Sequence, residues 1–188
     1  MEAAIRWSPH STPATPRFLI VDVAGNRLRL CQVVDTKNGK ISYKQISQRD
    51  KLPNFTAFDW SKTDESFVAV GSASGEANLV QVDSERSSQS QFIYSFPIRN
   101  QRKCNSIAFS TNNVLATGLD RVRNDFCMNI YDLNAGSPTL QAEPYRKLAS
   151  SEAVFSVKFL PSDPNLLIAG VARQCIRLYD LRGTSQFF

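Results

Sequence analysis

The feature that most constrains the fold of this chain is an aromatic residue that recurs about every 50 positions. Its four occurrences are separated by 53, 49 and 50 residues, and they are Trp7, Trp60, Phe109 and Phe159. Each closes a short apolar run, and two more apolar runs follow, as in VFSVKFL, LLIAGV and CIRLYDL of residues 154–181. Short runs with alternating β-branched and aromatic residues are typical of β-strands. Since self-similarity at a fixed period marks a repeat protein, the chain is predicted to repeat one β-sheet unit four times.

A glycine recurs near the end of the predicted second strand of each unit. It is Gly71, Gly118 and Gly170 in the last three copies, whereas the first copy has Asp22 or Gly25 nearby. An aromatic residue, three strands and a glycine that recur together are a far stronger sign of a repeat than any one of them alone.

A fourth apolar run follows each of the first three copies, at residues 41–47, 91–98 and 145–150. These runs predict outer strands that complete four-stranded sheets. The fourth copy reaches Phe188 where its outer strand should begin, so the edge of its third strand is expected to be unpaired. Its predicted turns are the polar stretches 162–165 and 173–174.

Four-stranded units whose third strand ends in an aromatic–Asp pair are typical of the blades of a WD-repeat β-propeller. We therefore expect an all-β fold with almost no helix, in one domain over 1–188, with blades at about 1–50, 51–100, 101–150 and 151–188. A unit of this length with WD-like endings favours about four blades of a larger ring, open or truncated. A self-closed ring of four blades is the alternative.

An open array leaves the faces of its first and last sheets uncovered. Side chains such as Ile20, Leu30, Val157 and Leu178 are expected to be exposed there. Uncovered apolar faces favour self-association.

The acidic members of the aromatic–Asp pairs are Asp132 and Asp180, and we expect a structural role for both. In a WD unit a histidine supplies part of the hydrogen-bond network around this aspartate, and no copy here has it. The two carboxylates are therefore expected to accept from backbone N–H groups or from hydroxyls such as Ser106 and Ser156.

Composition excludes several classes of function. The net charge of +5 is modest and does not by itself predict nucleic-acid binding. His10 is the lone histidine and the four cysteines form no C-x-x-C pair, so neither a metal site nor a catalytic triad is expected. No glycine-rich phosphate loop is present, so no cofactor is expected. The start of the chain has no apolar signal segment, and no apolar run reaches about 18 residues, as a membrane-spanning helix requires.

The most unusual loop is residues 120–126, which carries Arg121, Arg123 and Asp125 between two predicted strands. One interpretation is a docking surface for acidic or aromatic partners. The other is an internal lock, in which Arg121 or Arg123 pairs with Asp120 or Asp125. Further basic residues precede the same blade, but linkers and hairpins need not share a face, so the two interpretations stay open.

Three strings carry a resemblance to a known family: Arg102-x-Cys104-Asn105, Gly118-Leu119-Asp120-x-x-Arg123-x-Asp125-Phe126 and Asp180-Leu181-Arg182-x-Thr184-Ser185-Gln186. Generic WD repeats do not share them, and they resemble the Mio family of WD-repeat proteins. The resemblance covers nearly the whole chain and is closest over residues 100–186. It implies a seven-bladed propeller in a longer protein that continues into an α-solenoid and a zinc-binding region, neither of which is present here.

The resemblance also implies a role. Mio proteins are subunits of the SEA complex of yeast and the GATOR complex of animals, which relay amino-acid sufficiency to the TOR kinase. By this resemblance the chain is a non-catalytic scaffold whose partners are other subunits of such a complex. It would be cytoplasmic, reaching the vacuolar or lysosomal surface only through that complex.

Two other functions compete with the scaffold. Tyr179-Asp180-Leu181-Arg182 resembles the box by which propeller receptors bind the adaptor of a cullin-type ubiquitin ligase, so Arg182 is a second candidate docking residue. A basic propeller that binds RNA ranks last, because Phe126 is the only aromatic residue beside Arg121 and Arg123.

Overall fold

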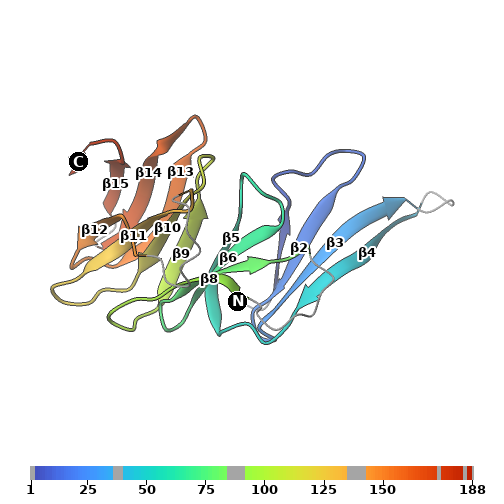
Figure 1. Cartoon of the computed structure of the whole chain (residues 1–188), viewed down its shortest axis with the longest axis horizontal. Coiled ribbons are helices and arrows are strands. Elements are labelled where there is room, and N and C mark those ends of the chain that lie inside the picture. Colours follow the sequence, from blue (N-terminus) through green and yellow to red (C-terminus); the bar gives the residue numbers. More distant parts are fainter. Residues whose placement is uncertain are drawn as a thin grey trace.

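The structure, a computed structural model, describes residues 3–35, 40–83, 92–134, 143–172, 175–183 and 186–187. These residues form four antiparallel sheets that follow one another along the chain (Figure 1). The first sheet is β1 (Ala3–Trp7), β2 (Arg17–Asp22), β3 (Arg27–Asp35) and β4 (Ile41–Arg49). The second is β5 (Phe55–Trp60), β6 (Phe67–Ser72), β7 (Ala77–Gln81) and β8 (Phe92–Phe96). The third is β9 (Cys104–Phe109), β10 (Val114–Leu119), β11 (Phe126–Asp132) and β12 (Arg146–Ser150). The fourth is β13 (Val154–Leu160), β14 (Asp163–Val171), β15 (Cys175–Asp180) and β16 (Gln186–Phe187).

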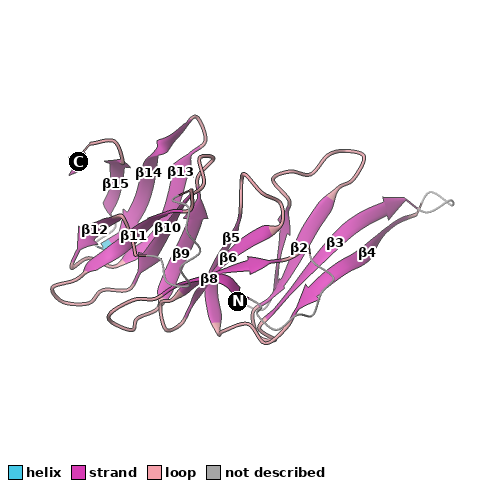
Figure 2. Cartoon of the chain, in the orientation of Figure 1, coloured by secondary structure: helices cyan, strands magenta, loops and turns pink. Residues whose placement is uncertain are grey.

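The strands of each sheet lie in chain order, and the sheets stand side by side as a partial β-propeller. Figure 2 shows that strands and loops make up nearly all of the described chain, which confirms the predicted all-β fold. A buried apolar cluster lies between each pair of neighbouring sheets. The first and fourth sheets lie at opposite ends of the array (Figure 1), so the self-closed alternative is wrong for this chain. The size of the full ring stays a prediction.

The recurring aromatic residues pack toward the preceding sheet. Trp60 is 2% exposed and shares a buried cluster with Leu19 and Leu30 of the first sheet. Phe109 is buried in the cluster between the second and third sheets, and Phe159 is partly buried in the next one. Trp7 has no preceding sheet among the described residues, and it is 62% exposed. Trp7 instead meets the edge of the Phe18 ring, with 5.5 Å between the two centroids. The first copy therefore exposes the aromatic residue that the second and third copies bury.

The recurring glycines face the following sheet. A Cβ on Gly71 would collide with the Cys104 side chain, and a Cβ on Gly118 would lie 2.7 Å from Val154 Cγ1. Cys104 and Val154 each begin the first strand of the next sheet. At Gly170, in the fourth copy, the nearest atom lies 3.8 Å away, on Ser156 of the same sheet.

The first copy has no glycine at this position. The β1–β2 register pairs Trp7 with Phe18, which places Val21 where the other copies have glycine. Asp22 ends β2 and Gly25 lies in the β2–β3 turn, where the Gly25 N–H donates to Asp22 Oδ1 at 2.8 Å. Both lie nearby, as the sequence indicates, but neither occupies the equivalent position. The first copy thus has a valine side chain at the place of close approach, and Figure 1 shows the first sheet inclined away from the other three.

A polar latch also recurs, four residues before the aromatic anchor. The Thr56 hydroxyl donates to the Cys104 carbonyl, and Asn105 Nδ2 donates to the Val154 carbonyl at 3.2 Å. The first copy has Ala3 there, whose side chain cannot donate, and the fourth copy has Phe155. The latches therefore join the last three sheets, and the first junction uses other contacts, such as the Arg17–Glu65 ion pair at 3.0 Å.

The fourth sheet differs from its prediction at two points. The β13–β14 turn is tighter than predicted, because Asp163 already pairs with Leu160 and opens β14. The third strand is not wholly unpaired, because β16 pairs with Leu178 and Tyr179. The predicted turn at residues 173–174 lies outside the described residues.

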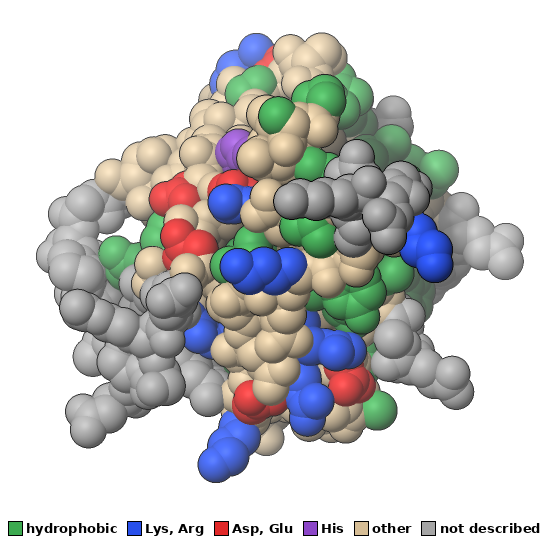
Figure 3. Space-filling view, turned by 90° about the vertical axis from the view of Figure 1, so that its right-hand side faces the viewer, with side chains coloured by type: hydrophobic (Ala, Val, Ile, Leu, Met, Phe, Trp, Pro, Cys, Tyr) green, Lys and Arg blue, Asp and Glu red, His purple; other side chains and the backbone are tan. Residues whose placement is uncertain are grey.

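Both ends of the array expose apolar side chains, although only partly the predicted ones. Leu30 and Val157 are buried, because alternate residues of a strand point to opposite faces and these two point to the neighbouring sheet. Leu178 is 39% exposed, as predicted. The exposed apolar side chains of the two end sheets are Ile5, Trp7, Ile41 and Tyr43 at one end, and Phe155, Leu160, Ile168, Ile176 and Leu178 at the other. Figure 3 shows the first of these ends, where hydrophobic side chains lie beside lysines and arginines.

We expect the chain on its own to self-associate and to bind a hydrophobic dye, because several exposed apolar side chains gather on each of the two end sheets. Replacing Phe155 and Ile176 with serine and threonine should reduce both effects without loss of stability, since both side chains are more than half exposed. Sedimentation and dye fluorescence measure this. A monodisperse wild-type monomer that binds no dye would contradict it.

Candidate docking surface

The segment 97–103, which leads from the second sheet into β9, lies on the same rim as the β10–β11 hairpin, residues 120–125. Antiparallel pairing dictates this, because β9 begins where β10 ends. The Asp120 N–H donates to the Lys103 carbonyl at 2.9 Å, and the Arg102 N–H donates to the Ser74 carbonyl of the β6–β7 hairpin at 3.1 Å. The linker and the hairpin therefore share one face of the molecule, a question that the sequence alone did not decide.

Gly75 allows this crossing of segments. Its φ of +97° lies in the left-handed region, which disfavours any side chain. A Cβ there would also collide with the Arg102 carbonyl oxygen and with Ile98. Glycine at this position thus lets the linker lie directly on the β6–β7 hairpin.

A clamp centred on Asp125 ties the linker to the β10–β11 hairpin. Arg102 pairs with Asp125 at 2.8 Å and donates to the Phe126 carbonyl at 2.7 Å. Asn100 Nδ2 adds a second donor to Asp125 at 2.9 Å. Because only 5% of the Arg102 side chain is exposed, this pair is better shielded from solvent than the other ion pairs of the described residues.

The internal lock thus exists, but with a different arginine. Asp125 takes Arg102, and Asp120 accepts from Asn105 Nδ2 at 2.7 Å. Neither Arg121 nor Arg123 forms an ion pair within the described part of the chain, so the predicted lock through them is wrong. Arg102 is buried beside the Asp125 carboxylate, whereas Arg121 and Arg123 are exposed to solvent.

The clamp governs the titration of Asp125. Burial raises the pKa of this carboxyl, but hydrogen bonds from Asn100, the Phe126 N–H and Arg102, together with the Arg102 charge, outweigh burial and lower the pKa below its ordinary value. A lowered pKa in the folded state stabilises the fold above the ordinary pKa, and the contribution is lost as the pH falls through the folded value.

Asp125→Asn should therefore destabilise the chain near neutral pH, and the stability gap to the wild type should shrink as the pH falls from about 6 to about 3. Urea unfolding at a series of pH values measures the gap. A gap that stays constant over this range would mean that the ionised clamp does not contribute.

Four cations surround the clamp, and we call them the basic rim: Arg99, Lys103, Arg121 and Arg123. All four side chains are exposed. None of them has an ion-pair partner among the residues that the structure describes. Because no carboxylate of the described residues neutralises their charges, they are available to a partner.

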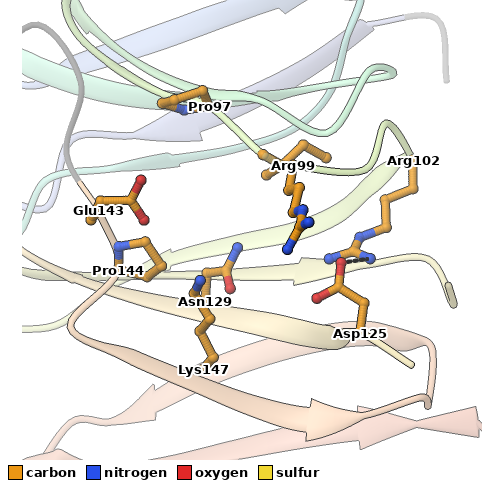
Figure 4. Close-up of a pocket in the computed structure, with 9 residues that line it drawn as sticks. Pro97, Arg99, Arg102, Asp125, Asn129, Glu143, Pro144 and Lys147 are labelled. Atoms are coloured by element: carbon orange, nitrogen blue, oxygen red, sulfur yellow. Dashed lines mark hydrogen bonds and ion pairs between the residues drawn. The ribbon is translucent and has the colours of Figure 1, made fainter. Parts of the chain in front are cut away.

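A cavity of about 340 Å³ opens beside the basic rim, between the linker and the outer strands of the third sheet. Figure 4 shows its lining, with Arg99 and Arg102 from the linker, Asn129 from β11 and Lys147 from β12. Asp125 and Glu143 contribute carboxylates, and two prolines, Pro97 and Pro144, contribute rigid apolar walls. Sequence reasoning missed this cavity, because its residues come from three separate segments.

No family model matches the chain. It is 27% identical to the GATOR2 complex protein MIOS of Danio rerio, over 97% of this chain and 24% of that protein. It is 30% identical to the GATOR2 complex protein Mio of Drosophila melanogaster over 64% of the chain, and 31% identical to SEH-associated protein 4 of Saccharomyces cerevisiae over 53%. The chain is a homologue of these Mio-type proteins. It spans about a quarter of the length of the Danio rerio relative.

The fold has a solved counterpart. The crystal structure of Raptor from Chaetomium thermophilum superposes with a TM-score of 0.71 over 99% of this chain and 16% of that one. The identity is 14%, so this likeness concerns the fold alone. Within the chain, the strings that resemble the Mio-type proteins contain both members of the Arg102–Asp125 and Asn105–Asp120 pairs.

The other predicted docking residue, Arg182, lies on the opposite rim, because it follows β15 whereas the hairpin precedes β11. Arg182 pairs with Asp180 at 2.9 Å and with Asp163 at 3.1 Å. These contacts hold the turn after β15 and do not bring Arg182 to the basic rim. They give the ubiquitin-ligase alternative no support.

The two aspartates of the aromatic–Asp pairs accept from nearby backbone N–H groups. Asp132 accepts from the Asn134 N–H and Asp180 from the Arg182 N–H, both at 2.9 Å. The Ser106 hydroxyl, which was expected to donate to one of them, instead accepts from the Val157 N–H of the next sheet at 3.0 Å. Ser106 therefore joins two sheets and does not serve the aspartate.

The described residues offer little for catalysis or metal binding. No group of three or more His, Cys, Asp or Glu side chains among them could hold a metal ion. Burial raises the pKa of the Cys104 thiol to about 12, which leaves it unreactive at neutral pH. His10 Nε2 lies 3.1 Å from the Ser61 carbonyl and links the first two sheets. Within the described part of the chain, no helix has the length and apolar character needed to cross a bilayer.

Proposed function

We propose that the chain is a non-catalytic scaffold that docks other subunits of a GATOR2- or SEA-type complex. The observation that carries the proposal is homology to proteins named as GATOR2 complex subunits, together with a partial propeller whose basic rim has no ion-pair partner among the described residues. Through such a complex the chain would take part in relaying amino-acid sufficiency to the TOR kinase. Its place would be the cytoplasmic face of the vacuole or lysosome, reached through partners.

In this proposal each sheet is one blade, with boundaries near residues 50, 100 and 150, in a ring of seven. The residues at the recurring aromatic, glycine and aspartate positions have structural roles in the repeat: Trp7, Trp60, Phe109, Phe159, Gly71, Gly118, Gly170, Asp132 and Asp180. Arg121 and Arg123 are the docking residues, and Asp125 holds their hairpin in place through Arg102. Arg182 holds a turn on the opposite rim.

Affinity purification of the tagged chain from its own cells tests the proposal. We expect identified subunits of a GATOR2- or SEA-type complex to co-purify with the chain. An Arg121→Gln/Arg123→Gln variant should recover less of them with an unchanged melting temperature, because both side chains are exposed and unpaired within the described chain.

Lys158→Gln is the matched control, since Lys158 is an exposed cation on β13 of the fourth sheet. It should recover as much as the wild type. Recovery of a cullin-ligase adaptor in place of those subunits would overturn the proposal.

A further inference from the structure

The charges around the cavity beside the basic rim are unevenly paired. Arg102 and Asp125 neutralise one another at 2.8 Å. Arg99 and Lys147 remain as exposed cations without an ion-pair partner among the described residues, against the single carboxylate of Glu143. The cavity therefore has a surplus of positive charge, and the basic rim extends that surplus along the hairpin.

A buried amide lies between these two cations. Asn129 is 6% exposed, and Figure 4 shows its amide turned into the cavity, with Arg99 and Lys147 on either side. On the side away from the cavity opening, the Asn129 amide contacts the Tyr131 hydroxyl. An asparagine amide has two N–H donors, so one contact with Tyr131 leaves a donor for a ligand. Two cations and an N–H donor around one space are the groups that bind a carboxylate.

The shape of the site favours a protein segment over a nucleic acid. The cavity is at the small end of the range for ligand sites, and its proline walls suit a side chain. A phosphate backbone needs a continuous positive groove with aromatic residues for stacking. Here Glu143 would repel a row of phosphates, whereas a segment with spaced carboxylates can avoid it.

We propose that the cavity and the basic rim bind an acidic segment of a partner protein. One Asp or Glu carboxylate of that segment enters the cavity between Arg99 and Lys147 and accepts from the Asn129 amide. Neighbouring carboxylates meet Arg121 and Arg123 on the hairpin. This inference rests on the proposed docking function and names the chemistry of the docked partner.

Fluorescence anisotropy with a short labelled peptide of alternating glutamate and serine tests the proposal on the whole chain. The peptide should bind, a peptide with glutamine in place of glutamate should not, and binding should weaken as the ionic strength rises from about 0.05 to about 0.5 M. An Arg99→Gln/Lys147→Gln variant should bind about tenfold more weakly, since it removes both exposed cations that pair with the entering carboxylate. Lys158→Gln, the exposed lysine of the fourth sheet, should leave the affinity unchanged.

The double variant should also keep the wild-type melting temperature, because neither side chain has an ion-pair partner within the described chain. Equal binding of the glutamine peptide, tighter binding of a single-stranded RNA oligonucleotide, or unchanged affinity in the double variant would each overturn the proposal. The peptide assay is independent of the purification experiment. If peptide binding fails while the complex subunits still co-purify, this inference falls and the scaffold function stands. If the peptide binds and no such subunit co-purifies, the scaffold function falls alone.

Discussion

Trp60→Ala is expected to lower the free energy of unfolding by about 3–5 kcal/mol. The indole is 2% exposed in the cluster between the first two sheets, and its Nε1–H donates to the Glu65 carbonyl at 2.7 Å. Truncation would therefore leave a cavity at a sheet junction and an acceptor without its donor. Urea unfolding followed by circular dichroism measures the loss.

Trp7→Ala is the matched control, because Trp7 occupies the same repeat position in the first sheet. Its side chain is 62% exposed and has an edge contact with Phe18. We expect the loss to be about 1 kcal/mol or less, the range of a single aromatic pair. A loss under about 1 kcal/mol for Trp60→Ala would show that the strand register is wrong. Equal losses at the two positions would show that the first sheet is not at the end of the array.

Gly118→Ala has the second large expected effect, a loss of about 1–3 kcal/mol. The added methyl would lie 2.7 Å from Val154 Cγ1 and 3.2 Å from the Val154 carbonyl oxygen. The shorter distance requires Val154 to shift, and Val154 belongs to the large core shared by the third and fourth sheets. The strain therefore acts on the contact between the two sheets and not on β10 alone.

Gly170→Ala is the control at the equivalent position of the fourth sheet. The new methyl would lie 3.8 Å from Ser156 Cβ, an ordinary contact, so stability should be unchanged or slightly raised. Denaturant unfolding of the two variants side by side decides the matter. If both variants lose the same stability, the loss comes from replacing a strand glycine as such and not from the close approach of the next sheet.

The candidate docking surface could be foreseen only in part. The two hairpin arginines were visible as an unusual loop, and they are exposed as a docking residue must be. Arg102 and Arg99 were visible as basic residues of a linker, but their positions relative to the hairpin depend on how β9 and β10 pair. Asn129 and Lys147 gave no signal, because a strand residue acquires a ligand-binding role only when another segment forms a cavity over it.

The sequence by itself determined the strands, their order within each sheet and the fourfold repeat. These follow from alternating apolar residues and turn residues, which act over a few neighbouring positions. Only the tertiary structure decided which equivalent residues are buried. Trp60 and Trp7 share one repeat position, as do Gly118 and Gly170. In each pair the first residue packs closely against a neighbouring sheet and the second does not, because no further sheet lies beside it in the described chain. The choice of Arg102 over Arg123 as the partner of Asp125 has the same cause, because burial and ion pairing depend on segments that meet only when neighbouring sheets pack.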